Sequence, residues 1–397
     1  MNDIYRIYLS ALRAFVRGSA PEPVPQEQWA ALMELARINS TLGILSHVYL
    51  NHPDLTPEQL RPVLRRQCLQ EAAMYAARGN QMALLAAEFD RAGIDFILFK
   101  GFVLRNFYPV PELRTYGDVD LVIRREDRAK SDELMKRLGY EPRDTWEPAY
   151  SYQRGVEYYE VHTDVMEVDV SDKADYITYF SRIWDHTCPS QTLRLPHALE
   201  FTPEFHLLYL LTHIAKHISV SGAGIRMYLD IAFFLKRFEL DWQWIAGELE
   251  CLALSNFANV VFCAVEDWFG VECPLPRRSV PAEVMADFLE FTLSGGVYGY
   301  AGRDKGTVFL KQQDRSREDK VSRTRTLLHH AFPPVRSLEN RYTYLQTKPW
   351  LLPAAWVHRL ADSRTEWARF AGHTREILSA DMDEVKKLKR LYRELGL

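Results

Sequence analysis

Apolar residues recur every three to four positions through the first ninety residues of the chain, as in WAALMELARIN and LLAAEFDRAG. This spacing places the apolar side chains along one face of a helix. The pattern predicts three or four helices, which together form an N-terminal helical region over residues 1–92.

At Gly93 the pattern changes to short runs of β-branched and aromatic residues, which are typical of strands. A helical pattern with acidic residues in its first turn separates two of these runs. The predicted strands are 94–100 and 118–124, the predicted helix is 126–140, and 158–170 is either one long strand or a hairpin. Because strands and helices alternate, we expect an α/β core over residues 93–190.

Helical periodicity returns after Pro203, in stretches such as HLLYLLTHIAKHI and IRMYLDIAFFLKRF. A segment rich in glycine and charge at 292–323 predicts an exposed loop, and the last thirty residues again have a helical pattern. We therefore expect a C-terminal helical domain over residues 191–397. The whole chain is predicted to have an α+β fold in which helical regions flank the core.

The composition excludes several classes of protein. The chain has 397 residues, of which 47% are hydrophobic, and a net charge of −4, so disordered and fibrous proteins are excluded. Five scattered cysteines do not form a disulfide framework. The apolar stretches are about a dozen residues long, shorter than a membrane span requires, and the N-terminus lacks the pattern of a signal peptide. We expect a cytoplasmic protein without a membrane partner.

Charge is distributed unevenly along the chain. Residues 311–397 contain 18 Lys and Arg against 11 Asp and Glu, so the first 310 residues carry a net charge of about −11. The basic region could hold a triphosphate or an acidic acceptor, or it could simply be a solvated surface that faces an acidic domain. Its candidate residues are Arg323, Arg325, Arg336, Arg341, Lys348 and Arg359. Because the overall charge is negative, we do not expect nucleic acid as a partner.

The chemistry is concentrated around the sequence DVD at 118–120. Side chains alternate between the two faces of a strand, so Asp118 and Asp120 point the same way. Two carboxylates about 7 Å apart along one strand repel each other unless a cation lies between them, and hard oxygen ligands in this arrangement suit Mg²⁺. An isolated pair of this kind is more often a simple turn cap.

Further polar residues accompany this pair. Lys100 and Gly101 follow the preceding strand at the start of a predicted helix, where free backbone N–H groups can bind an anion. Arg114 could hold a phosphate or a carboxylate. On the strand that begins at 158, the residues that share one face include Glu160, His162 and Asp164. Either acidic residue could supply a third carboxylate.

These residues resemble a known family. The sequence KG, then YPVPELRTYGDVDLVI and later YYEVH, is similar to the uncharacterised nucleotidyltransferase family of the DNA polymerase beta-like superfamily. The resemblance is specific over residues 96–164 and extends more loosely through 206–234. It implies a polymerase beta-like nucleotidyltransferase core, in which a small mixed sheet packs with helices.

The resemblance also implies roles for individual residues. Asp118 and Asp120 would bind two Mg²⁺ ions, for which Mn²⁺ can substitute, and Glu160 would complete the site as the third catalytic carboxylate. Lys100 and Gly101 would cradle the triphosphate, and Gly117 would give the backbone room beside it. The wider superfamily usually has Gly-Ser or Gly-Gly at the turn, whereas Phe102 follows Gly101 here, so that Lys100 or backbone amides must serve.

The helical segment supplies weaker candidates. His213 and His217 are one turn apart, but the glutamate of the zinc-hydrolase motif is missing between them. We favour helix packing or a hydrogen bond to the active site for this pair. Arg226 and Asp230 have the spacing of an ion pair on a helix. We place His162, His213 and Asp230 in a second tier of residues that line the acceptor pocket.

The predicted activity is metal-dependent transfer of a nucleoside monophosphate from an NTP, with ATP as the expected nucleotide, to a small-molecule or protein acceptor. Pyrophosphate would be released. Two alternatives are a catalytically inactive module with the same fold, which binds a nucleotide or a protein partner, and an RNA-tailing enzyme. The sequence does not identify the acceptor.

Overall fold

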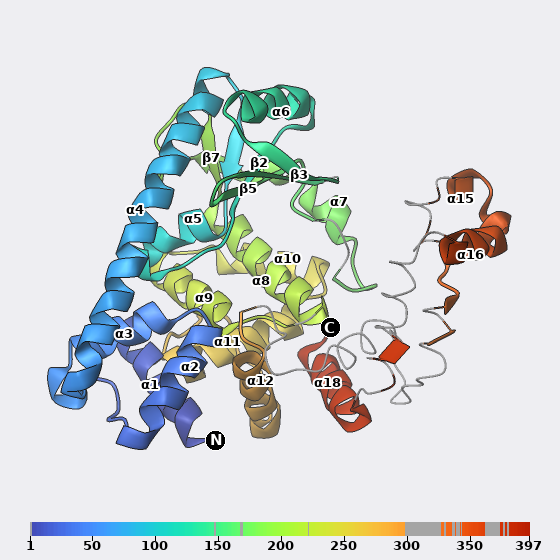
Figure 1. Ribbon diagram of the computed structural model, residues 1–397. Helices are drawn as coiled ribbons and strands as arrows, with labels where there is room; N and C mark the ends of the chain where they lie inside the picture. The colour runs from blue at the N-terminus through green and yellow to red at the C-terminus, as the bar shows by residue number, and fades with distance from the viewer. Residues whose placement is uncertain are drawn as a thin grey trace.

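The computed structural model describes residues 2–146, 148–166, 170–220, 222–297 and 381–397, together with short stretches between 327 and 378. Figure 1 shows a sheet with helices around it. Within the described residues, no helix combines the length and the apolar character that crossing a bilayer requires.

The N-terminal region contains four helices, in agreement with the helical periodicity. Asn2 caps the first helix by accepting a hydrogen bond from the Ile4 N–H, and Gly18 ends it in a left-handed conformation. The long fourth helix runs from the N-terminal helices along the side of the sheet (Figure 1). The bounds are α1 Asp3–Arg17, α2 Trp29–Ile38, α3 Leu42–Leu50 and α4 Arg61–Arg91.

The core is a seven-stranded mixed sheet with the order β3-β4-β5-β2-β1-β7-β6. Strand β2 is antiparallel to β1 and parallel to β5, and β1 is parallel to β7. The strands are β1 Phe96–Leu98, β2 Val119–Ile123, β3 Glu141–Trp146, β4 Ala149–Arg154, β5 Glu157–His162, β6 Thr187–Pro189 and β7 Ala198–Phe201. The short helices among them are α5 Gly101–Leu104, α6 Arg128–Arg137 and α7 Tyr176–Phe180.

Beyond the sheet the chain is helical. The helices are α8 Pro203–Val220, α9 Ile225–Arg237, α10 Trp242–Cys251, α11 Ser255–Phe269, α12 Ala282–Ser294, α15 Tyr344–Thr347, α16 Leu352–Ala361 and α18 Met382–Leu395. Helix α18 packs near α11, where Asn256 donates a hydrogen bond of 3.0 Å to the Glu394 carbonyl. Helices flanking a small mixed sheet confirm the predicted α+β fold class.

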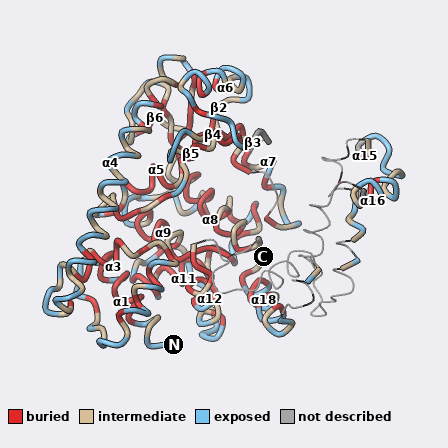
Figure 2. Tube along the Cα trace, viewed as in Figure 1, coloured by how far each residue is buried: buried red, intermediate tan, exposed pale blue. Residues whose placement is uncertain are grey.

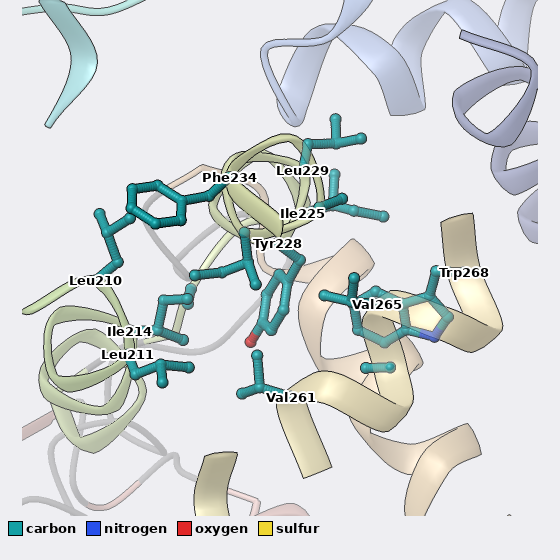
Figure 3. Close-up of a cluster of buried hydrophobic side chains, with 14 of the residues drawn as sticks. Leu210, Leu211, Ile214, Ile225, Tyr228, Leu229, Phe234, Val261, Val265 and Trp268 are labelled. Carbon is teal, nitrogen blue, oxygen red and sulfur yellow. The ribbon is translucent and has the colours of Figure 1, made fainter. Parts of the chain in front are cut away.

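Two hydrophobic cores hold the sheet and the helices packed around it, and a smaller cluster lies at α15 and α16. One lies between the sheet, α4 and α6, and the other lies among the helices. In the second core, side chains of α8, α9 and α11 converge, as Figure 3 shows, and the ring centroids of Tyr228 and Trp268 are 5.1 Å apart. Figure 2 shows buried positions along both the strands and these helices. The packed helices fix the position of α8 and α9 beneath the sheet.

Two sequence predictions about elements need correction. The run at 158–170 is not one long strand: β5 ends at His162 and forms a hairpin with the preceding β4. The loop predicted to begin at residue 292 begins later, since α12 continues to Ser294, and residues 298–323 lie outside the described part of the chain.

Candidate active site

The centre of the site is the parallel pair of strands β2 and β5. In their register Asp120 lies opposite Glu160. Because side chains alternate along a strand, His162 is on the same face of β5 as Glu160. Asp118 directly precedes β2 and is close enough to Asp120 and Glu160 for their charges to affect its titration. The structure therefore brings the three predicted carboxylates together.

His162 joins this cluster. Its Nε2 lies 3.1 Å from Oδ1 of Asp120 and 3.4 Å from Oε2 of Glu160. One ligand atom from each of the three residues lies within 4.8 Å of the others, so these residues could hold a metal ion. Asp120 and His162 are buried, whereas the Glu160 side chain is 28% exposed. Carboxylates with an imidazole are a chemically suitable donor set for a divalent cation.

Lys100 approaches the cluster from the turn after β1. Its Nζ lies 2.7 Å from Oδ1 of Asp120 and 5.1 Å from the centroid of the Phe99 ring. The Lys100 backbone has φ 57° and ψ −137°, a conformation that costs free energy in a residue with a Cβ. Such strain is found where the surrounding structure fixes a functional residue, and here it directs the lysine into the carboxylates.

The charges in this cluster shift the pKa values of its members in opposite directions. Burial would raise the pKa of Asp120, but the charge of Lys100 and the hydrogen bond with His162 outweigh burial and lower it. The pKa of Asp118 is raised, first by burial and then by the charge of Asp120. Burial would lower the pKa of His162, yet hydrogen bonds with Asp120 and Glu160 raise it. Asp120 is thus the firmly ionised carboxylate.

The alternative third carboxylate, Asp164, lies in a different environment. Its Oδ2 forms an ion pair of 3.1 Å with Nη2 of Arg125. It lies beyond the end of β5 and outside the group of residues that could hold a metal. This geometry favours Glu160 over Asp164.

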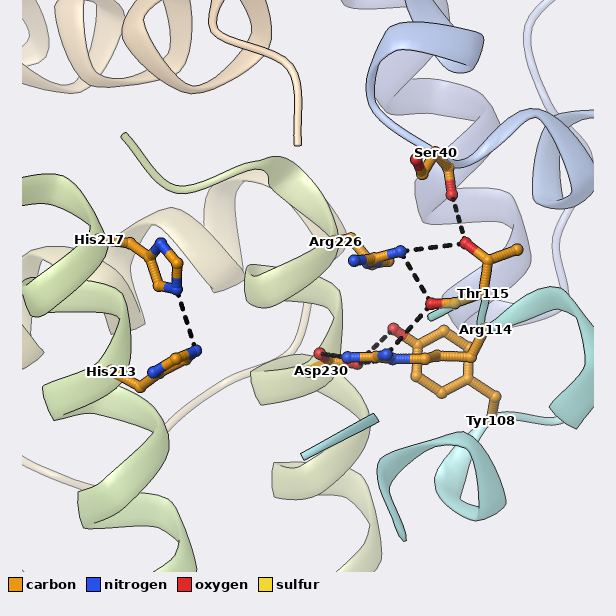
Figure 4. Close-up of polar contacts among 8 residues, drawn as sticks. All are labelled: Ser40, Tyr108, Arg114, Thr115, His213, His217, Arg226 and Asp230. Carbon is orange, nitrogen blue, oxygen red and sulfur yellow. Dashed lines mark hydrogen bonds and ion pairs between the residues drawn. The ribbon is translucent and has the colours of Figure 1, made fainter. Parts of the chain in front are cut away.

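His213 and His217 on α8 lie near the same cluster, since the charge of Lys100 lowers the pKa of both. Their Nε2 atoms are 3.1 Å apart (Figure 4), and the His213 ring stacks on Tyr209. Burial lowers the pKa of His213, and it lowers the pKa of His217 to about 4. Two neutral imidazoles that share a hydrogen bond therefore line this side of the site.

Arg114 and Asp230 contact each other. Nη2 of Arg114 lies 2.6 Å from Oδ2 of Asp230, and its Nε donates to Oδ1 at 3.1 Å. The Tyr108 hydroxyl also donates to Oδ1, at 2.8 Å (Figure 4). Both charged side chains are buried, with 7% and 4% exposed. The sequence predicted that Arg114 binds the nucleotide and that Asp230 lines the acceptor pocket. In this structure they instead form an ion pair that connects α9 to the segment before β2.

The sequence predicted that Arg226 pairs with Asp230 on the helix, but the structure directs the Arg226 guanidinium to Thr115. Its Nη1 donates to the carbonyl oxygen and to the hydroxyl of Thr115, at 2.8 and 3.0 Å. The Thr115 hydroxyl in turn donates to the Ser40 carbonyl at 3.3 Å (Figure 4). These contacts hold the segment that leads to Asp118 between α9 and the N-terminal helices.

The two glycines of the predicted nucleotide site occupy different positions. Gly101 is buried against Arg114 and Tyr116, and a Cβ at Gly101 would lie 2.6 Å from Nη1 of Arg114. This glycine is required for close packing of the turn. Gly117 is exposed and directly precedes Asp118, where the backbone is accessible.

A pocket of about 350 Å³ opens beside the segment that leads into β2. Thr115 and Tyr116 line it from this segment, and Tyr75 and Arg78 line it from α4. The Arg78 guanidinium carbon lies 5.2 Å from the centroid of the Tyr116 ring. Aromatic faces and a guanidinium suit planar or anionic ligands.

Some features were missed by sequence reasoning, and others are untested. Tyr108, which anchors Asp230, has no local signal in the sequence, because its partner is 122 residues away. The alternation of the strand already places His162 on the same face as Glu160, but it does not predict the contact of His162 with Asp120 on the neighbouring strand. Of the basic candidates, Arg323, Arg325, Arg336 and Arg341 lie outside the described residues.

Comparisons with known proteins identify the class. The sequence model of the family described as uncharacterised nucleotidyltransferase matches residues 25–270. The chain therefore belongs to this nucleotidyltransferase family, as the motifs predicted. No curated protein matches the chain.

One similar solved structure is the antibiotic-resistance factor ANT(2'')-Ia, determined in solution and described as having substrate-regulated conformation dynamics. It is 12% identical, with a TM-score of 0.33, and the alignment covers 48% of this chain and 96% of that chain. Family membership supports nucleotidyl transfer as the general activity.

Proposed function

We propose that the chain transfers a nucleoside monophosphate from an NTP, with ATP as the expected donor, to a small-molecule or protein acceptor. The observation that carries this proposal is the pairing of Asp120 with Glu160 on parallel strands, beside Asp118 and Lys100. Carboxylates that converge in this way can hold the divalent cations on which nucleotidyl transfer depends. The protein is expected in the cytoplasm.

Different residues of the site would bind the cations and the phosphates. Asp118, Asp120 and Glu160 would hold two divalent cations, Mg²⁺ or Mn²⁺, which when bound neutralise the phosphates and lower the pKa of a coordinated hydroxyl. The ammonium of Lys100 would bind phosphate oxygens of the NTP, helped by the backbone at Gly101 and Gly117. The strained Lys100 backbone holds the side chain ready for this role.

In the reaction, an acceptor oxygen forms a bond to the α-phosphorus, and the bond from that phosphorus to the bridging oxygen breaks. Pyrophosphate leaves with the electron pair of the broken bond. The proton of the acceptor hydroxyl passes to a water molecule at the open side of the cluster, where the Glu160 side chain is 28% exposed. The neutral pair His213 and His217 lines the same space and would orient the acceptor.

The pocket lined by Tyr75, Arg78, Thr115 and Tyr116 adjoins the segment that leads into Asp118. Arg114 and Asp230 would position this segment through their buried ion pair and would not touch the substrates.

The test is incubation of the purified chain with ATP labelled at the α-phosphate, a divalent cation and an extract that supplies acceptors. We expect label in a new small molecule or protein, and none with the Asp118→Ala/Asp120→Ala variant. Equal labelling by both proteins would refute the proposal. An increase in melting temperature with metal and ATP but without transfer would instead support a binding module, and transfer to RNA would support a tailing enzyme.

A further inference from the structure

We propose that His162 is a direct ligand of the divalent cation at this site and that its nitrogen makes the site prefer Mn²⁺ to Mg²⁺. The proposal rests on the proposed function in so far as that function brings a divalent cation to the carboxylates. It changes the expected donor set from oxygen alone to oxygen with one imidazole.

The spacing of the donor atoms carries the argument. Neighbouring ligands of an octahedral ion with bonds of about 2.1 Å are about 3 Å apart. Nε2 of His162 lies 3.1 Å from Oδ1 of Asp120 and 3.4 Å from Oε2 of Glu160. One ion could therefore contact all three atoms after small movements of the side chains and loss of the proton on Nε2 of His162, which would ligate as the tautomer protonated on Nδ1.

The backbone, rather than a flexible loop, sets this spacing. Glu160 and His162 alternate on β5, and Asp120 is the register partner of Glu160 on β2. Both strands have neighbours on each side within the sheet. The His162 side chain is 7% exposed, and the Phe99 ring meets it edge to face with centroids 5.9 Å apart. The imidazole is thus fixed in the site before any cation binds.

Lys100 is the group that a cation would displace. Both Lys100 Nζ and His162 Nε2 contact Oδ1 of Asp120, at 2.7 and 3.1 Å. The lysine has a flexible stem and 21% of its side chain is exposed, so its ammonium can move toward a bound phosphate. His162 is enclosed and has no comparable freedom, so it would stay within reach of the cation.

The donor set decides the preference between metals. Mg²⁺ binds through oxygen ligands and retains several waters, whereas imidazole favours transition metals. Mn²⁺ accepts the same carboxylate oxygens as Mg²⁺, and as a softer transition-metal ion it binds an imidazole nitrogen more readily than Mg²⁺ does. Two carboxylates and one imidazole therefore favour Mn²⁺.

The first test is electron paramagnetic resonance of Mn²⁺ added to the full chain without nucleotide. In pulsed measurements we expect a nitrogen coupling, which changes to the ¹⁵N pattern when the protein is made with ¹⁵N-histidine. Competition with Mg²⁺ should show Mn²⁺ binding tighter by about tenfold or more. Mn²⁺ bound without any histidine coupling, or equal affinity for both ions, would overturn the proposal.

The second test assigns the nitrogen. His162→Gln should remove the coupling and weaken Mn²⁺ binding by about tenfold or more, because loss of even an outer partner of a metal ligand costs 10- to 100-fold. His217→Gln, next to the same cluster, should retain the coupling. His197→Gln is a matched control, since Nδ1 of His197 pairs with Asp95 at 2.7 Å elsewhere on the sheet. Coupling that persists in His162→Gln and disappears in His217→Gln would contradict the assignment.

The outcomes separate this proposal from the proposed function. Histidine-coupled Mn²⁺ in a chain that never releases pyrophosphate would support the ligand assignment and refute the function. Transfer that proceeds with Mg²⁺, and with Mn²⁺ that is bound by oxygen alone, would support the function and refute the ligand assignment. The wild-type measurement needs no variant, so poor folding of His162→Gln does not prevent a decision.

Discussion

The ammonium of Lys100 lies 2.7 Å from Oδ1 of Asp120, an oxygen that also contacts Nε2 of His162. Two basic side chains thus converge on one buried carboxylate, while Asp118 and Glu160 add negative charge nearby. A group of carboxylates held this close requires positive charge. The same requirement makes the site suited to a divalent cation and a triphosphate.

Replacing Asp120 should abolish the activity. Asp120→Asn keeps the shape of the side chain but removes the charge that is central to the cluster, so we expect the rate of nucleotidyl transfer to fall by about 100-fold or more. The matched control is Asp164→Asn, because Asp164 pairs with Arg125 beyond the end of β5. Similar losses in the two variants would contradict the assignment of Asp120 to the metal site.

The pair of Arg114 and Asp230 should matter for stability. Arg114→Met leaves the Asp230 carboxylate buried without its cation, and we expect the free energy of unfolding to fall by about 3–5 kcal/mol. The pair of Arg125 and Asp164, in which the arginine side chain is 60% exposed, is the control, for which Arg125→Met should cost less than about 1 kcal/mol. Denaturant unfolding measures both. The prediction is wrong if the two substitutions cost the same.

Gly101 should not tolerate a methyl group. In Gly101→Ala the new Cβ would meet Nη1 of Arg114 at 2.6 Å and Cβ of Tyr116 at 2.9 Å, and we expect a loss of about 1–3 kcal/mol. Gly247 in α10 faces open space, so Gly247→Ala should be neutral or stabilise the helix by up to about 1 kcal/mol. Thermal unfolding compares the two variants, and an unaffected Gly101→Ala would show that the turn is not tightly packed.

Stability should decrease in mild acid partly because of His206. Burial lowers the pKa of His206 to about 3, and within the described residues its Nε2 has no hydrogen-bond partner. The unfolded chain binds this proton below about pH 6.5, but the folded chain binds it only near pH 3. Between these pH values this histidine therefore lowers the free energy of unfolding by about 1.4 kcal/mol for each unit that the pH falls.

His206→Phe removes this titration. The free energy of unfolding of the variant should depend less steeply on pH between about pH 6 and pH 3. The slopes of variant and wild type should differ by roughly the contribution of one proton. Phenylalanine suits the surroundings, since the rings of Phe201 and Phe234 already contact His206. Parallel pH profiles for the variant and the wild type would show that His206 does not titrate in this way.

The sequence predicted the strands that carry the chemistry because their signal is local. Asp118 and Asp120 are two residues apart, as are Glu160 and His162, and this spacing follows directly from the alternation of a strand. The predicted boundaries of β1 and β2 were correct within two residues. Here the local pattern and the tertiary structure agree.

Other parts of the fold depend on contacts that no local pattern contains. Strands β3 and β6 include proline and lack alternation, so only pairing with their neighbours defines them. Arg114 and Asp230 are 116 residues apart, and each was expected to face a ligand. The tertiary structure pairs them because a buried charge needs a partner of opposite sign.

The most direct test of the central claim is the rate of pyrophosphate release from ATP in the presence of Mg²⁺ or Mn²⁺. The wild type, the Asp164→Asn control and the Asp118→Asn/Asp120→Asn double variant should be compared with the same acceptor extract. We predict release by the first two proteins, dependent on the metal and abolished by chelation, and none by the double variant. Release by all three proteins at the same rate would contradict the assignment of nucleotidyl transfer to these carboxylates.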